Sequence, residues 1–256
     1  MPGPASQARS DLGALPRRRA TKGSGKRERL SGTIVQVDAK FWEERWAQRQ
    51  IGFHEGAPNS LLAKHVALLE GCRRVYVPLC GKAVDVSFLR SRGHDVTGSE
   101  LVGTAIAELF AENGLVDAED ETGPFRRHRA ERLLVLEGDA FAVEPAHLGG
   151  PVDAVYDRAA LVALDPKTRE RYVASLVRVL APGAKVLLVT FDYDQSKLDG
   201  PPWAVTDEAV HTLYGDAFRV EIVEEREASG GPKFAAAGVS SLRERLYLLT
   251  SLTPRG

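Results

Sequence analysis

The sequence lacks the patterns that mark several large classes of protein. Its two cysteines, Cys72 and Cys80, do not form a Cys-x-x-Cys pair, so neither a disulfide framework nor a zinc site is supported. No apolar run approaches the roughly 18 residues of a membrane-spanning helix, and no apolar segment of a secretory signal stands near the N-terminus. We therefore expect a cytoplasmic protein that has no contact with a membrane and holds no metal ion.

Several catalytic signatures are missing as well. The chain contains no Gly-x-Gly-x-x-Gly, no Gly-x-x-x-x-Gly-Lys-Ser/Thr, no His-Glu-x-x-His and no Gly-x-Ser-x-Gly. The first two absences disfavour a nicotinamide dehydrogenase and a P-loop nucleotidase, because both folds bind phosphate through glycine-rich turns. The last two disfavour a zinc protease and a serine hydrolase of the common kinds.

Positive charge is concentrated at the N-terminus, and the rest of the chain carries a net negative charge. The net charge is −1, yet residues 1–40 hold nine Lys and Arg against three Asp and Glu. Few large apolar side chains stand there to offset the entropy of ordering. We predict a disordered basic tail over 1–36 and a single folded domain over 37–254. Arg17-Arg18-Arg19 could touch nucleic acid or anionic lipid, but we favour a solvated extension and expect a monomer without a nucleic-acid partner.

Apolar strands alternate with helical patterns through the rest of the chain. We expect helices from Asp38 to about Gln50, from Ser60 to Leu69, and at 83–91, 103–112, 167–180 and 207–213. We expect strands at 74–78, 95–99, 133–137, 152–156, 185–191, 219–224 and 244–250. This alternation predicts an α/β fold: a Rossmann-like, doubly wound, mostly parallel seven-stranded sheet with helices on both faces and an antiparallel C-terminal strand pair.

The first strand and its turn form the most informative segment of the chain. It reads Val75-Tyr76-Val77-Pro78-Leu79-Cys80-Gly81-Lys82, and the next strand ends in the carboxylate Glu100. Gly81 lets the backbone approach a ligand, and an acid at the end of the second strand can accept hydrogen bonds from ribose hydroxyls. A single glycine suits a cofactor without a pyrophosphate, which favours S-adenosylmethionine over a dinucleotide. The alternative is a strand-turn-helix whose carboxylate caps a helix or is simply solvated.

Two later strand ends carry polar residues that could reach the same ligand. Asp139 follows the third strand, where it could read an adenine edge or simply cap a turn. Arg158 follows the fourth strand and could bind a carboxylate or stabilise an anionic substrate. A salt bridge between Arg158 and Asp157 is the structural alternative.

A set of motifs in this order resembles the thiopurine S-methyltransferase family. The motifs are Phe41-Trp42-x3-Trp46, Ile51-Gly52-Phe53-His54, Val77-Pro78-Leu79-Cys80-Gly81-Lys82, Arg92-Gly93-His94, Asp157-Arg158-Ala159-Ala160-Leu161-Val162-Ala163, Gly200-Pro201-Pro202 and Leu246-Tyr247-Leu248-Leu249. The resemblance spans about residues 38–250. It implies an S-adenosylmethionine-dependent methyltransferase that moves a methyl group to the sulfur of an aromatic or heterocyclic thiol.

The resemblance also implies roles for single residues. The cofactor-binding residues it implies are Trp42, Trp46, Phe53, Leu79, Gly81, Glu100, Asp139, Ala140 and Arg158. Phe53 would be shared with the substrate, Lys233 would lie near the acceptor, and Arg158 would be the catalytic residue near the reacting thiol. Without the resemblance, Trp42 and Trp46 at helical spacing would be interpreted as core packing.

The sequence departs from the family pattern at two places. Leu101-Val102-Gly103-Thr104 follows Glu100 where the family usually has Ser-Glu, and Lys233 stands where many members carry arginine. Lysine keeps the charge but loses the planar fork. Three alternatives stay open: a related methyltransferase for halide, small thiol, or selenium and tellurium species, a non-catalytic S-adenosylmethionine-binding protein, and a nicotinamide dehydrogenase.

Overall fold

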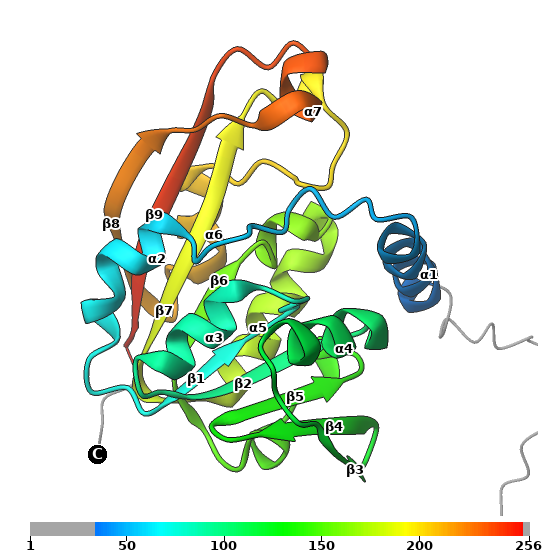
Figure 1. Ribbon diagram of the computed structural model, residues 1–256. Helices are drawn as coiled ribbons and strands as arrows, with labels where there is room; N and C mark the ends of the chain where they lie inside the picture. Colours follow the sequence, from blue (N-terminus) through cyan, green and yellow to red (C-terminus); the bar gives the residue numbers. More distant parts are fainter. Residues whose placement is uncertain (1–33, 253–256) are drawn as a thin grey trace, which may run out of the picture.

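A nine-stranded sheet runs through the protein in the order β3-β4-β5-β2-β1-β6-β7-β9-β8. It is seen in a computed structural model that describes residues 34–252 (Figure 1). The strands are β1 (Arg74–Val77), β2 (Asp95–Glu100), β3 (Ala118–Thr122), β4 (Phe125–Ala130), β5 (Leu133–Glu137), β6 (Val152–Arg158), β7 (Leu180–Tyr193), β8 (Phe218–Glu227) and β9 (Leu242–Ser251). The predicted basic tail lies outside the described residues, apart from its last three positions, where a helix begins.

Five adjacent strands, from β5 to β7, are parallel to one another. Most of their residues are buried on both faces, including the small and polar residues of β2, as expected of strands covered by helices on two sides. The predicted α/β class and the mostly parallel sheet are therefore confirmed. The expected C-terminal antiparallel pair is also present, with β9 placed between β7 and β8.

The strand count differs from the predicted seven, because a charged hairpin adds two strands at one edge of the sheet. β3 and β4 pair antiparallel, and β4 pairs antiparallel with β5. The β3 sequence, Ala-Glu-Asp-Glu-Thr, is almost wholly exposed. An edge hairpin needs no apolar alternation when solvent covers it, so hydrophobic periodicity gave no signal for it.

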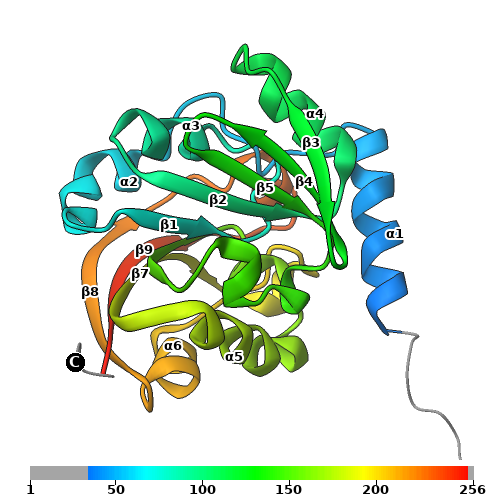
Figure 2. The ribbon, with the colours of Figure 1, turned by 90° about the horizontal axis from the view of Figure 1, so that it is seen from below.

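Helices cover both faces of the sheet (Figure 2). The α-helices are α1 (Ile34–Ala47), α2 (Ser60–His65), α3 (Val84–Ser91), α4 (Gly103–Glu112), α5 (Arg169–Val179), α6 (Asp207–Tyr214) and α7 (Gly231–Ala236). Apolar side chains of α2, α3 and α4 form one buried cluster with the sheet, and those of α5 and α6 form another on the opposite face. The predicted helices are present, although α1 begins at Ile34 rather than at Asp38, and α7 was not predicted.

The parallel strands bring their carboxyl ends to one edge of the sheet. β1 lies at the switch point, because the chain runs outward to β2 and β5 on one side and to β6 and β7 on the other. Ligands of doubly wound sheets bind at this edge. Within residues 34–252, no helix is both long enough and apolar enough to cross a membrane.

Candidate active site

The turn after β1 contains two residues with left-handed backbone conformation. Leu79 has φ +48° and Gly81 has φ +50°. A Cβ atom at Gly81 would lie 3.1 Å from Cζ2 of Trp46, which is tighter than most real contacts. Glycine is therefore needed both for the conformation and for the close approach of Trp46. Leu79 has no such freedom, so its conformation is a local strain of the kind that concentrates at functional sites.

Glu100 ends β2 directly opposite this turn, and its carboxylate is buried. Its Oε2 accepts a hydrogen bond from the Gly81 N–H at 2.8 Å. Its Oε1 accepts from the N–H groups of Leu101 and Val102, each at 2.8 Å. Burial raises the pKa of Glu100, while these three hydrogen bonds act in the opposite direction. A carboxylate offers about four lone-pair sites, so Oε2 keeps capacity for one further donor.

Three aromatic side chains gather above the turn. Phe53 lies edge-on to Trp42 and to Trp46, with ring centroids 5.8 Å and 5.9 Å apart. These rings pack with the Val102 and Ala105 side chains at the start of α4. The structure thus brings the aromatic residues of the first two motifs to the loop that holds Glu100.

Arg158, the last residue of β6, connects this aromatic cluster to the sheet. Its Nη1 donates to the Phe53 carbonyl oxygen at 2.7 Å, and its Nη2 pairs with the Glu55 carboxylate. Its Nε is buried and has no hydrogen-bond partner. The next residue, Ala159, has φ +70°, a second strained non-glycine residue at the carboxyl edge. The alternative of a salt bridge between Arg158 and Asp157 is wrong, because Arg158 pairs with Glu55.

Asp157 points to the other face of β6, as neighbours on a strand do. Its Oδ1 accepts a hydrogen bond from the Leu161 N–H at 3.1 Å, and its Oδ2 accepts one from the Tyr172 hydroxyl at 2.7 Å. Complete burial raises the pKa of Asp157 to about 6, although these hydrogen bonds oppose the shift. The carboxylate therefore anchors α5 beneath the loop that follows Arg158.

Asp139 and Ala140 lie just beyond the end of β5. Asp139 caps the short helix that starts at Ala140, since its Oδ1 accepts a hydrogen bond from the Phe141 N–H at 2.9 Å. The Gly138 N–H donates to the Glu100 carbonyl oxygen at 2.9 Å. The Asp139 turn is therefore held beside the Glu100 loop.

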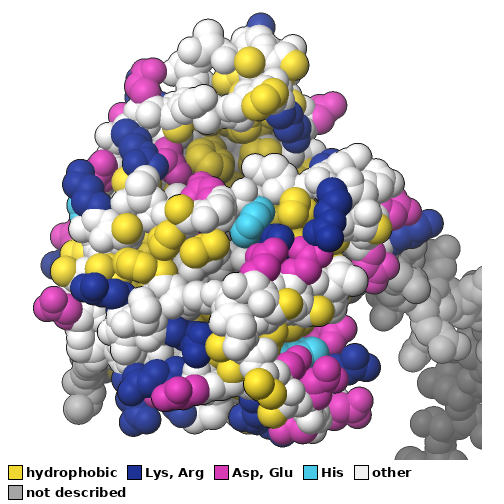
Figure 3. Space-filling model, viewed as in Figure 1, with side chains coloured by type: hydrophobic (Ala, Val, Ile, Leu, Met, Phe, Trp, Pro, Cys, Tyr) yellow, Lys and Arg dark blue, Asp and Glu magenta, His cyan; other side chains and the backbone are white. Residues whose placement is uncertain are grey.

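Lys233 is the one predicted site residue that stands apart from the others. It is exposed on α7, and its Nζ donates to the Pro201 carbonyl oxygen at 2.5 Å. The pKa of Lys233 is lowered, first by burial and then by the nearby guanidinium of Arg45. Within residues 34–252, no hydrogen bond or ion pair joins Lys233 to the aromatic cluster. Figure 3 shows apolar side chains in a hollow between the part of the molecule that carries α7 and the part that carries α4.

A chain of ion pairs near the site was missed from the sequence. Lys82 Nζ lies 2.9 Å from Glu108 and 2.6 Å from Glu112, and Glu108 lies 2.6 Å from Arg49. These contacts fasten the turn after β1 and the end of α1 to α4. The spacing of Glu108 and Glu112, four apart on one helix face, was the available signal. Beside them His54 has its pKa lowered by burial and by Lys82, and its Nδ1 is buried without a partner.

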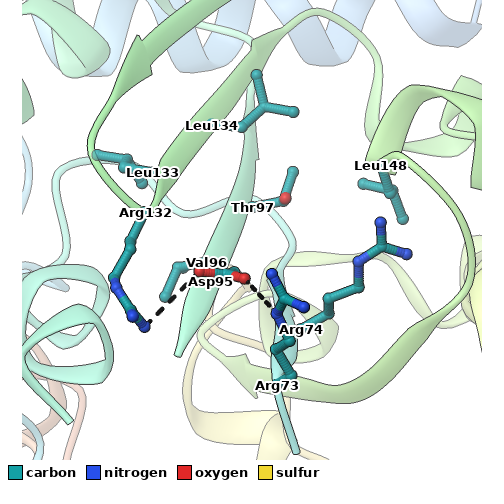
Figure 4. Close-up of a pocket in the computed structure, with 9 residues that line it drawn as sticks. All are labelled: Arg73, Arg74, Asp95, Val96, Thr97, Arg132, Leu133, Leu134 and Leu148. Atoms are coloured by element: carbon teal, nitrogen blue, oxygen red, sulfur yellow. Dashed lines mark hydrogen bonds and ion pairs between the residues drawn. The ribbon is translucent and has the colours of Figure 1, made fainter. Parts of the chain in front are cut away.

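A cavity lies at the opposite, amino-terminal edge of the sheet. It has a volume of about 350 Å³, and Figure 4 shows its charged lining around Asp95. The lining residues are Arg73, Arg74, Asp95, Val96, Thr97, Arg132, Leu133, Leu134 and Leu148. Arg73 Nε lies 2.8 Å from Asp95, and Arg132 lies 3.8 Å from it. None of the predicted site residues lines this cavity.

A buried histidine on the edge hairpin has carboxylates around it. His128 Nδ1 lies 2.6 Å from Asp117, and its Nε2 lies 3.0 Å from Glu137. Burial acts to lower the pKa of His128, but the hydrogen bonds to Asp117 and Glu137 outweigh it, so the pKa lies above its usual value. Although Glu119 is also near, a histidine held between two acids accounts for this cluster, and it links the residue before β3 and the strand β4 to the end of β5.

Comparisons with known proteins identify the family. The model of the family described as thiopurine S-methyltransferase matches residues 37–252. A thiopurine S-methyltransferase of Pseudomonas paraeruginosa is 45% identical over 216 residues, which cover 83% of this chain and 99% of the relative. The enzyme of that name from Methylococcus capsulatus is 42% identical over 217 residues, or 83% of this chain and 97% of its own length.

Solved structures show the same fold at low sequence identity. A Burkholderia thailandensis 1,6-didemethyltoxoflavin-N1-methyltransferase, solved with S-adenosylhomocysteine bound, is 17% identical and gives a TM-score of 0.56, covering 86% of this chain and 88% of its own. An S-adenosylmethionine-dependent methyltransferase from Methanosarcina mazei is 17% identical, with a TM-score of 0.55 over 77% and 99%. The chain has this methyltransferase fold, and it belongs to the thiopurine S-methyltransferase family.

Proposed function

We propose that the protein transfers the methyl group of S-adenosylmethionine to the sulfur of an aromatic or heterocyclic thiol. The observation that carries the proposal is the buried Glu100 carboxylate, which faces the glycine turn after β1 and keeps one lone pair free. A carboxylate in this place supports a ribose-bearing ligand. Membership of the thiopurine S-methyltransferase family supports the reaction type.

The residues around Glu100 fit such a cofactor. Gly81 presents its backbone without a side chain beneath the Trp46 ring, and Leu79 stands at the strained position two residues before it. Trp42, Trp46 and Phe53 would cover the ligand and exclude water from the reacting atoms. Asp139 and Ala140 would meet the adenine ring, because their turn is hydrogen-bonded to the Glu100 loop.

The chemistry makes small demands on acid and base groups. The bound cofactor supplies a methyl group on a sulfonium, which an acceptor sulfur takes by in-line displacement as the old carbon–sulfur bond breaks. A thiol has a reference pKa of about 8.5, so part of it is already ionised near neutrality. Orientation of two reactants can contribute roughly 7–11 kcal/mol. The protein therefore has mainly to position the acceptor and favour its anion.

Arg158 is the residue that we assign to the anion of the acceptor. Its Nε has no partner, and its side chain is mostly buried at the carboxyl edge. Its contact with the Phe53 carbonyl oxygen holds it at the residue that cofactor and acceptor would share. Lys233 would be a second cation on the acceptor side, and its hydrogen bond to the Pro201 carbonyl oxygen would hold it there. The small-molecule acceptor, the cytoplasmic location and the monomeric state are predictions from the sequence.

The direct test is calorimetry with S-adenosylmethionine, followed by assays of S-adenosylhomocysteine formation with single acceptors. The acceptor set should contain aromatic thiols, thiopurines, a halide, a small aliphatic thiol, selenite and tellurite. We expect micromolar binding and turnover on the aromatic or heterocyclic thiols. Turnover only on selenium or tellurium species, or only on halide, would replace the proposed acceptor. A folded protein that binds no S-adenosylmethionine would refute the whole proposal.

A further inference from the structure

Arg169, the first residue of α5, is a buried cation that forms no ion pair within residues 34–252, although the charge of Asp165 acts on it. Its side chain is 5% exposed. Its Nε donates to the Leu164 carbonyl oxygen at 3.3 Å, and its Nη1 donates to the Ala204 carbonyl oxygen at 3.2 Å. Its Nη2 is buried and has no partner, and among residues 34–252 no carboxylate forms an ion pair with it.

This is an unfavourable place for a positive charge. Burial removes the guanidinium from water, and carbonyl dipoles offset that loss only in part. The N-terminus of a helix carries partial positive charge, so a cation there is repelled by the helix itself. Burial lowers the pKa of Arg169 accordingly. Helix stability by itself would favour a neutral or acidic residue at this position. The contacts of the Arg169 guanidinium must therefore account for the arginine.

The two carbonyl groups belong to two loops at the carboxyl edge of the sheet. Leu164 lies in the loop that follows Arg158, and Ala204 lies in the loop that follows β7. The Trp203 N–H also donates to the Val162 carbonyl oxygen, at 2.6 Å. The second loop includes Pro201, whose carbonyl oxygen receives the hydrogen bond from Lys233. Arg169 thus lies beneath both loops and joins them by one rigid fork.

We propose that Arg169 is a positioning residue for the methyl acceptor, acting by fixing the 200–204 loop against the loop that follows Arg158. The inference rests on the proposed function, because that function makes these loops the wall of the acceptor site. The planar guanidinium suits this task, since it donates in two directions from one pre-organised group. Lysine has a single point charge and would reach one carbonyl group at a time.

The kinetic test compares Arg169→Met and Arg169→Lys with the matched variant Arg74→Met. Arg74 also donates to two backbone carbonyl groups, of Gly149 and Pro151, but at the amino edge of the sheet. We expect Arg169→Met to raise the KM for the thiol acceptor by about tenfold, because small misplacements of a substrate are costly. The affinity for S-adenosylmethionine, measured by calorimetry, should change less than twofold. Arg169→Lys should recover part of the loss, and Arg74→Met should change neither quantity.

A spectroscopic test reports the loop without relying on turnover. The chain has three tryptophans, so a Trp42→Phe/Trp46→Phe background leaves Trp203, on the loop itself, as the single tryptophan. In that background Arg169→Met should shift the Trp203 emission to the red and increase quenching by acrylamide, whereas Arg74→Met should not. Should the wild type methylate no thiol, the proposed function fails while this readout still decides whether Arg169 holds the loop.

Three results would overturn the inference. One is an acceptor KM that stays within twofold of wild type in Arg169→Met. Another is an equal loss of acceptor and S-adenosylmethionine binding, which would indicate general destabilisation. The third is an unchanged Trp203 signal. If Arg169→Met does not fold, the same measurements on Arg169→Lys decide, with a smaller rise in KM and a smaller spectral shift expected.

Discussion

The two edges of the parallel sheet differ in the way they hold charge. At the amino edge, Arg73 and Asp95 pair in the open, with side chains 82% and 36% exposed. At the carboxyl edge, Glu100 is 8% exposed and is held by backbone N–H groups rather than by a counter-ion. The amino edge has a cavity of about 350 Å³, whereas the carboxyl edge has, in Glu100, a buried carboxylate with hydrogen-bonding capacity left over.

A cavity and the buried polar groups that can bind a ligand need not lie at the same edge of the sheet. The carboxyl ends of β1 and β6 have strained residues, Leu79 and Ala159, and Arg158 at that edge has a buried Nε without a partner. In the amino-edge cavity Arg73 and Arg132 pair with Asp95 in contact with solvent, so these ion pairs gain little from a ligand. Buried polar groups with unmet hydrogen bonds are what a ligand can satisfy.

The largest expected difference is in S-adenosylmethionine affinity when the acid at either end of β2 is replaced. We predict that Glu100→Gln weakens S-adenosylmethionine binding by roughly 10- to 150-fold, because a hydrogen bond to a charged group contributes about 1.5–3 kcal/mol. Asp95→Asn, at the other end of the same strand, should leave the affinity unchanged. Calorimetry on both variants measures this. Equal effects of the two substitutions would contradict the assignment of the site to the carboxyl edge.

The next difference in activity is expected between Arg158 at the carboxyl edge and Arg132 at the amino edge. We expect Arg158→Met to lower kcat/KM for the thiol by about tenfold or more, since a charge-assisted contact in a desolvated site is lost. Arg132→Met, which removes a partner of Asp95 at the amino edge, should leave kcat/KM within twofold of wild type. Steady-state assays with varied acceptor provide the comparison. Full activity in Arg158→Met would remove this residue from the mechanism.

Two glycines in left-handed conformation, Gly71 and Gly81, differ in their surroundings. Gly71, before β1, has φ +78° and open space around it, whereas Gly81 has Trp46 beside it. Alanine at either position should lower the free energy of unfolding by about 1–2 kcal/mol, because the conformation disfavours a Cβ atom. Only Gly81→Ala should also weaken cofactor binding, as Trp46 must move. Chemical denaturation and calorimetry test both parts, and a binding loss in Gly71→Ala would count against this explanation.

The smallest effect is a pH dependence at the carboxyl edge. The native pKa of Asp157 is about 6, above its ordinary 3.8, so the folded state holds the proton more tightly than the unfolded state. The stabilising contribution is present in full below about pH 4 and is lost as the pH rises through 6. Between pH 5 and pH 7 the loss is about 1 kcal/mol. Asp157→Asn should remove this slope from denaturation curves, whereas Asp95→Asn should keep it.

Most of the fold could be predicted from the sequence because its core strands are apolar and regularly spaced. The helix α4 was predicted at its observed bounds, and β2 and β5 within one residue. The hairpin of β3 and β4 was missed because exposed edge strands need no apolar face. The helix α7 was missed because six residues around Phe234 are too few for a helical period to be recognised.

The candidate site was predictable where a motif placed a residue at a strand end. Glu100 and Arg158 were found in this way, and both end a strand in the structure. The partners of these residues were not predictable, because Glu55 and the Gly81 N–H meet them only through the folded chain. The Lys82–Glu108 ion pair and the contacts of Arg169 were missed for the same reason. The first joins the turn after β1 to α4, and the second join α5 to the loops that follow β6 and β7.

The sequence by itself determined the class of fold, the family and the strand ends at which the polar residues stand, because periodicity and motif order are properties of the chain. Only the tertiary structure decided which of these groups are buried, which are paired and which keep an unmet hydrogen bond. Burial and pairing depend on every element packed around a group, and they set its pKa and its capacity for a ligand. Asp157 and Arg158 illustrate the difference, for they are neighbours in the chain and serve opposite faces of one strand.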